Sequence, residues 1–310
     1  RRRWQEPADT RETNTARRRR ARNRWAVTAL MALALLSFLV WLLLQWNPKT
    51  PFVFVTVTKY DTPVPVNAWA LEDREALELL NGSNITVPKL PEWKTDDNHF
   101  ELLPESFHVS DYRRSAPVVI YVSAHGVVRD DGTPCILPPG VSINESKHWV
   151  PVKQLLDEIR EKIPSPRNTL LVLDCNRIRV DWNLGIVYNS FAEQVEALVN
   201  SKDWPGIAVL LSAGPGQVNW TSEDFRGTVF GRFLQLGLAG AADTKDVDGD
   251  VSLAELTNYL KHEVSAWALA NRGEPQEPVL LPRDVKSFHV CYPIRGSWLP
   301  IKSTSLQDLT

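Results

Sequence analysis

Residues 117–126 read PVVIYVSAHG, and residues 169–177 read TLLVLDCNR. Each stretch begins with a short apolar run, rich in β-branched residues, that is typical of a strand buried on both faces. Each run then gives way to polar side chains: His125 follows the first, and Asp174 and Cys175 follow the second. A third run of this kind, GIAVLL at 206–211, leads into SAGPGQ. These stretches predict a buried sheet with reactive side chains along one edge.

Helical patterns alternate with these strands, which indicates an α/β domain with a largely parallel sheet. Residues 81–116 lack periodicity, so we expect a surface excursion with at most one short strand there. We expect one domain over 51–291, with strands at 52–58, 117–122, 169–173, 206–211 and 287–291 and helices at 68–80, 151–163, 189–201, 222–241 and 252–270.

The residues that follow the strands indicate where a site would lie. In open parallel sheets, ligand-binding residues lie just beyond the carboxyl ends of the strands. We therefore expect His125, Asp174 and Cys175 at the same edge. An imidazole there can take the thiol proton, and the thiolate can then attack a carbonyl. The sequence thus makes His125 and Cys175 candidate catalytic residues.

The formal net charge of −2 averages two different parts of the chain. Residues 1–24 hold ten arginines against three acids, whereas residues 25–310 hold 25 basic and 34 acidic side chains. The acidic body argues against nucleic acid as a partner. Three cysteines are too few for a disulfide scaffold. Because the chain begins at Arg1 and its single methionine is Met31, we expect a fragment or a processed product.

Residues 25–46, WAVTALMALALLSFLVWLLLQW, have the pattern of a transmembrane helix. The first twenty carry no charge, which matches the length that crosses a bilayer. Trp25 and Trp46 are 21 residues apart, about 32 Å of helix, and would lie at the two interfaces. The arginines of residues 1–24 predict a cytoplasmic N-terminus, and a linker at 47–50 then leads to an extracytoplasmic domain. A buried core helix is the alternative for the apolar run, and nucleic-acid binding for the arginines.

The domain resembles the caspase and metacaspase superfamily of cysteine peptidases, and is closest to bacterial membrane-anchored members. The resemblance covers residues 51–291 and leaves 292–310 as a C-terminal tail. It implies a three-layer sandwich with a mainly parallel six-stranded sheet, and a peptide or protein as substrate or ligand. It rests on His125-Gly126, Asp174-Cys175, SAGPGQ at 212–217, Gly227-Thr-Val-Phe230, DGDVSLAEL at 248–256 and QEPVLL at 276–281.

The resemblance makes His125 the general base and places the nucleophile two residues after the acid of the fourth strand. In this chain that position holds Asn176, and Cys175 lies one residue earlier. An amide cannot replace a thiolate as a nucleophile. Strand side chains alternate between faces, so Asp174 and Asn176 should share one face and Cys175 should point to the other, unless a bulge turns it back. Asp174 matches the acid that recognises a basic substrate residue in metacaspases.

The chain gives no indication of a metal or cofactor, since its histidines lack a zinc-binding spacing. Residues 244–255 approach a calcium-loop pattern, but the first position is Thr244, where an acid is needed. We interpret this segment as a polar turn in which Ser252 and Glu255 form a capping box.

Three functions remain open. The favoured one is a membrane-anchored, degenerate (inactive) peptidase that binds protein segments. The second is an active cysteine endopeptidase using His125 and Cys175, with Asp174 selecting a basic residue. The third is a structural module of a larger membrane protein.

Overall fold

The computed structural model describes residues 25–39, 49–81, 85–88, 102–103, 105–175, 177–178, 181, 184–245 and 247–293. The chain divides into two compact units, Arg1–Asn47 and Pro48–Thr310. In the first unit, residues 25–39 form a helix. Residues 1–24 and residues 40–46 of the predicted span lie outside the described residues. Within the described part, no helix is both long and apolar enough to cross a membrane, so the span stays a prediction.

A six-stranded sheet forms the centre of the second unit, in the order β2-β1-β3-β7-β8-β12. Neighbouring strands pair in parallel, except that β12 pairs antiparallel with β8. This arrangement confirms the predicted α/β class and the mainly parallel six-stranded sheet. The strands are β1 (Thr50–Thr56), β2 (Ile85–Thr86), β3 (Val118–Ser123), β7 (Thr169–Asp174), β8 (Ile207–Leu211) and β12 (Val279–Leu281).

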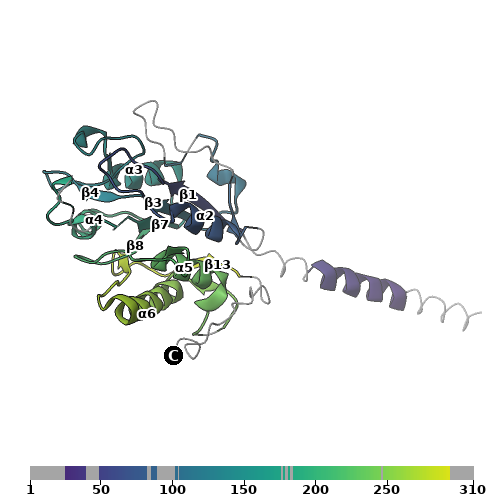
Figure 1. Cartoon of the computed structure of the whole chain (residues 1–310). Helices are drawn as coiled ribbons and strands as arrows, with labels where there is room; N and C mark the ends of the chain where they lie inside the picture. Colours follow the sequence, from purple (N-terminus) through teal and green to yellow (C-terminus); the bar gives the residue numbers. More distant parts are fainter. Residues whose placement is uncertain are drawn as a thin grey trace, which may run out of the picture. The chain divides into compact units, whose positions relative to one another are not determined.

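Helices cover both faces of this sheet (Figure 1). One face packs on α3 (Val152–Lys162) and α4 (Phe191–Asn200). The other packs on α2 (Ala70–Glu78), α5 (Val229–Leu236) and α6 (Leu253–Arg272). Alternate residues of each central strand enter different cores, which explains why these strands are apolar on both faces.

The helix expected over 222–241 begins later than the pattern predicted. Residues 221–228 instead form a hairpin of β9 (Thr221–Ser222) and β10 (Gly227–Thr228). The Oγ1 atom of Thr228 accepts a hydrogen bond from the Gly231 N–H, which sets the start of α5. After Leu236 the chain forms a π-helical turn, η4 (Gly237–Ala241), in which Gly240 has a φ of 115°.

The strand expected over 287–291 exists as β13 (His289–Cys291), but it lies outside the main sheet. It pairs antiparallel with β11 (Val251–Ser252). The sixth strand of the main sheet is β12, a three-residue strand between two prolines that the pattern did not predict. The capping box of Ser252 and Glu255 is confirmed at the start of α6.

The remaining described elements lie in the connections. After β3 a small antiparallel sheet forms from β4 (Gly126–Val128), β5 (Pro134–Ile136) and β6 (Val150–Pro151). Short 3₁₀ turns occur at η1 (Val109–Asp111) and η2 (Ser146–His148). The excursion over 81–116 holds the two-residue strand β2 and η1 among its described residues, in line with the prediction.

Candidate functional site

The candidate site lies at the carboxyl ends of β1, β3 and β7. The chain places β2 on one side of β1 and then β3 on the other, so the strand order reverses between β1 and β3. Such a reversal is where open α/β sheets bind ligands. Ser123 pairs with Asp174 in the sheet, and the Gly126 N–H donates to the Cys175 carbonyl at 2.8 Å. These pairings place His125, Asp174 and Cys175 along one edge of the sheet.

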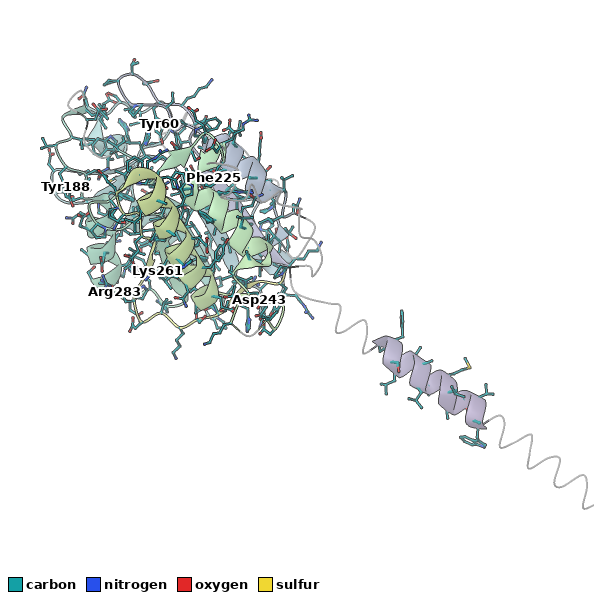
Figure 2. The ribbon with its side chains drawn as sticks, turned by 60° about the horizontal axis from the view of Figure 1, so that its bottom comes forward. Tyr60, Tyr188, Phe225, Asp243, Lys261 and Arg283 are labelled. Atoms are coloured by element: carbon teal, nitrogen blue, oxygen red, sulfur yellow. The ribbon has the colours of Figure 1, made fainter. Side chains whose placement is uncertain are left out.

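His125 is buried and neutral. Its ring stacks on Tyr60, labelled in Figure 2, with the ring centroids 4.7 Å apart. Its Nε2 lies 2.8 Å from the Pro65 carbonyl, which can only accept, so Nε2 carries the proton. Burial lowers the pKa of the imidazole to about 4. Among the described residues its Nδ1 has no hydrogen-bond partner, which leaves that lone pair unused.

Cys175 is also buried, with none of its surface exposed. Its Sγ donates to the Val122 carbonyl at 3.6 Å and lies in the core beneath α3 and α4, which includes Leu173 and Phe191. Burial, and to a lesser degree the charge of Asp174, raise the pKa of the thiol well above its ordinary value. A neutral thiol that hydrogen-bonds to a backbone carbonyl is a poor nucleophile.

Asp174 points to the opposite face of the sheet from Cys175, as the strand alternation predicted. Its carboxylate is fully buried and accepts four hydrogen bonds from side chains of this chain. The donors are Tyr121 Oη at 2.6 Å, Thr228 Oγ1 at 3.2 Å, Arg177 Nη2 at 3.3 Å and Asn219 Nδ2. Asn176 lies outside the described residues, so its place relative to His125 is not described.

A second carboxylate, Asp73 on α2, joins this cluster and was not predicted from the sequence. The backbone N–H of Thr228 lies 3.0 and 3.1 Å from its two oxygens. A Cβ at Gly227 or Gly231 would lie 2.5 or 2.7 Å from Asp73 Oδ1, so these glycines make room for the acid. Burial, followed by the nearby charge of Asp174, raises the pKa of Asp73 to about 7.

Arg177 supplies the cation of the cluster, and it too was not predicted. Its side chain is 7% exposed. The Nη2 atom lies 3.3 Å from Asp174 and 3.7 Å from Asp73. The sequence carried one signal for this cluster: Asp73 is four residues before Leu77, so on a helix it shares the apolar face.

Amide side chains connect Asp174 to the next strand. Asn219 donates to Asp174, and its Oδ1 accepts from Gln276 Nε2 at 2.7 Å. The same Nε2 donates to the Ser212 carbonyl at 3.0 Å, and the Trp220 N–H donates to Gln276 Oε1 at 3.0 Å. This network fixes the carboxylate and uses its lone pairs within the chain.

The described residues contain no group of three or more His, Cys, Asp and Glu side chains arranged to hold a metal ion. Asp246, in the segment weighed as a calcium loop, lies outside the described residues. The three cysteines Cys135, Cys175 and Cys291 are free and buried.

Comparisons with known proteins give a likeness of structure but no match to a family model or a curated sequence. No protein-family model matches the chain, and no curated protein matches its sequence. Among solved structures, the crystal structure of caspase-1 from Spodoptera frugiperda is similar, with 16% sequence identity and a TM-score of 0.49. The match covers 75% of this chain and 85% of that one. The described fold itself defines an α/β protein whose mainly parallel six-stranded sheet carries a buried histidine, thiol and carboxylate cluster at one edge.

Proposed function

We propose that residues 51–291 form a caspase-like domain that does not cleave peptides and that binds protein segments at the carboxyl end of its sheet. The caspase-like assignment is supported by the positions of His125, Asp174 and Cys175 at the ends of β3 and β7. The loss of cleavage is supported above all by one observation. Cys175 is buried in an apolar core, its thiol donates to Val122, and burial raises its pKa.

Thiol alkylation of the full chain tests the state of Cys175 directly. An ordinary thiol is a few per cent thiolate at pH 7, and each unit of raised pKa lowers that fraction tenfold. We expect iodoacetamide to modify Cys175 more than about 100-fold slower than a cysteine introduced at the exposed position Ser201 (Ser201→Cys), and to modify it readily in urea. Alkylation at Cys175 as fast as at the introduced cysteine contradicts a buried, neutral thiol.

Peptide turnover then tests the loss of cleavage. Arg-, Lys- and Asp-directed fluorogenic peptides should give no turnover above that of Cys175→Ala. Turnover in the wild-type chain that is lost in both Cys175→Ala and His125→Ala would establish the active endopeptidase instead.

Binding of protein segments is supported by exposed apolar side chains on the loops at this end. Val66, beside the Pro65 that holds His125, is 65% exposed. Val187 and Tyr188, in the loop that follows β7, are 63% and 59% exposed. Exposed apolar groups around the carboxyl ends of parallel strands suit a segment that docks there.

An array of short peptides probed with the full chain tests this binding. Peptides that bind the wild-type chain should lose binding to Val66→Asp and Tyr188→Ser but keep it to Leu79→Ser. Leu79 is 72% exposed and follows the carboxyl-terminal end of α2, whereas Val66 lies in the loop before this helix begins at Ala70. Equal binding by all three variants, or none by the wild type, would leave the structural-module function as the better account.

Membrane anchoring through residues 25–46, with a cytoplasmic N-terminus, is part of the same proposal and is supported by the apolar run and the flanking arginines. Extraction of membranes at alkaline pH should leave the full chain in the pellet and release a chain lacking residues 1–46. Release of both would contradict an integral anchor.

A further inference from the structure

A row of four aromatic rings lies along the seam between α6, α5 and the β9–β10 hairpin. Tyr259 contacts Phe233, with the ring centroids 6.4 Å apart. Phe225 in turn contacts Phe233 at 6.0 Å and Trp267 at 5.6 Å. All four side chains are partly exposed, and α6 lies on the outside of the domain, at the front of Figure 2, where Phe225 is labelled. The aromatic row therefore presents apolar surface to the outside.

The side of α6 that carries Tyr259 extends this surface. Ala266 and Ala270 follow Tyr259 by seven and eleven residues, so on a helix they share its side. Both alanines are exposed, and their small side chains let another segment approach the rings closely. Glu263 also lies on this side, four residues after Tyr259, and suits a segment that carries positive charge.

The aromatic row is closed at one end and open at the other. The Arg272 guanidinium lies 5.2 Å from the ring centroid of Trp267 and 5.7 Å from that of Trp220, which closes the row at the carboxyl-terminal end of α6. At the other end, a Cβ at Gly237 would lie 3.1 Å from Tyr259 Cδ1. Gly237 begins η4, so a segment can enter the row from the side of η4.

The C-terminal tail leaves the domain beside η4. Cys291 Sγ donates to the Leu238 carbonyl at 3.4 Å, and a Cβ at Gly240 would lie 3.3 Å from Pro293. The residues that follow, 294–310, lie outside the described residues and read IRGSWLPIKSTSLQDLT, with two basic side chains and one acid. Seventeen residues reach about 55 Å when extended. The aromatic row is at most about 18 Å long, so the tail is long enough to cover it.

We propose that residues 294–310 dock along the aromatic row of their own chain, with Trp298 and its apolar neighbours Leu299 and Ile301 against the rings. Only four residues separate Pro293 from Trp298. Such a short tether gives the apolar group an effective concentration of order millimolar, so a contact too weak to hold a free peptide suffices. This inference does not depend on the proposed function, because the aromatic row is not part of the site around His125.

Photo-cross-linking of the full chain tests this docking. p-Benzoylphenylalanine replaces Trp298 in one preparation and Ile301 in another. Each is mixed with an equal amount of the same chain grown with the heavy nitrogen isotope, and the mixture is irradiated. We expect mass spectrometry to find cross-links to α5, α6 or the β9–β10 hairpin within chains of one isotope. Cross-links only to other parts of the domain, or none from either position, would overturn the proposal.

A matched pair of substitutions on α6 provides the control. Ala266→Glu adds bulk and charge beside the rings, and the cross-link yield should fall at least about fivefold. Ala254→Glu makes the same change at another exposed alanine of α6. Because it lies five residues before Tyr259, it points about 140° away around the helix, and the yield should not change. An equal yield from the two variants would contradict docking on the aromatic row.

Two further results keep the outcome decisive. If Ala266→Glu loses the near-ultraviolet circular dichroism of the wild type, Ala270→Glu replaces it, because Ala270 is a second exposed position on the same side of α6. Cross-links found only between light and heavy chains would show that a second copy covers the row, which would also overturn the proposal. None of these results depends on the fluorogenic peptides or on the peptide array, so this proposal and the proposed function can fail separately.

Discussion

Replacing Asp73 by asparagine should change how the stability of the domain depends on pH. Asp73 is 3% exposed and accepts hydrogen bonds from the Thr228 N–H. Burial and the charge of Asp174 raise the pKa of this carboxyl from 3.8 to about 7, even though Arg177 lowers it. Asp73→Asn keeps the size and the acceptor oxygen, and it removes the titration.

The direction of this pH dependence follows from the proton that Asp73 binds in the folded chain. Between pH 4 and pH 7 the folded chain holds a proton on Asp73 that the unfolded chain has released. The resulting stability is present below pH 4 and is lost as the pH rises to about 7. A difference of about three pKa units corresponds to about 4 kcal/mol. Because asparagine does not titrate, the free energy of unfolding of Asp73→Asn should rise relative to wild type by about 4 kcal/mol over this range.

Urea unfolding followed by tryptophan fluorescence at pH 4, 5, 6, 7 and 8 measures this difference. Other titrating groups, including His125, are present in both chains and cancel when the two curves are subtracted. Asp131→Asn is the matched control, because Asp131 is exposed and hydrogen bonds from Thr133 lower the pKa of its carboxyl. Its difference curve should not rise toward neutral pH. If the difference in the free energy of unfolding between Asp73→Asn and wild type stays flat or falls with pH, Arg177 keeps Asp73 ionised over the whole pH range.

Two further predictions use the same site. His125→Gln should remove a pH dependence of the opposite direction, because burial lowers the pKa of His125 to about 4. As the pH falls from 6.5 to 4, the free energy of unfolding of wild type should fall by about 3 kcal/mol relative to this variant. The same urea series measures this change. Gly231→Ala should lower the free energy of unfolding by about 1–3 kcal/mol, because its Cβ would lie 2.6 Å from Thr228 Oγ1 and 2.7 Å from Asp73 Oδ1. Gly214→Ala, whose Cβ would meet its nearest neighbour at 3.4 Å, is the control, and equal thermal midpoints for the two variants would contradict the crowding at Gly231.

Several features could be predicted from sequence because they depend on local periodicity. The apolar runs of β3, β7 and β8 and the amphipathic spacing of α3 identified those elements within one or two residues. The capping box at Ser252 and Glu255 depends on a spacing of three residues along one helix start. The opposite orientations of Asp174 and Cys175 follow from the two-residue period of a strand.

Short elements could not be predicted, because their pairing partners are distant in sequence. The strand β12 has three residues and is defined by its pairing with β8, some 70 residues earlier. The start of α5 at Val229 depends on the β9–β10 hairpin and on the side chain of Thr228. The sequence prediction began a helix at residue 222, but the tertiary structure places residues 222–228 in a hairpin.

The sequence by itself determined the α/β class, the positions of the main strands and the presence of His125, Asp174 and Cys175 at one edge of the sheet. Only the tertiary structure decided their chemical states. Burial makes His125 and the Cys175 thiol neutral, since a charge is poorly solvated in the core. Contacts across 155 residues join Asp73 to Thr228, and contacts across 110 residues join Arg177 to Asn67. Such long-range contacts leave no periodic signal, and they determine which side chains surround Asp73 and Asp174.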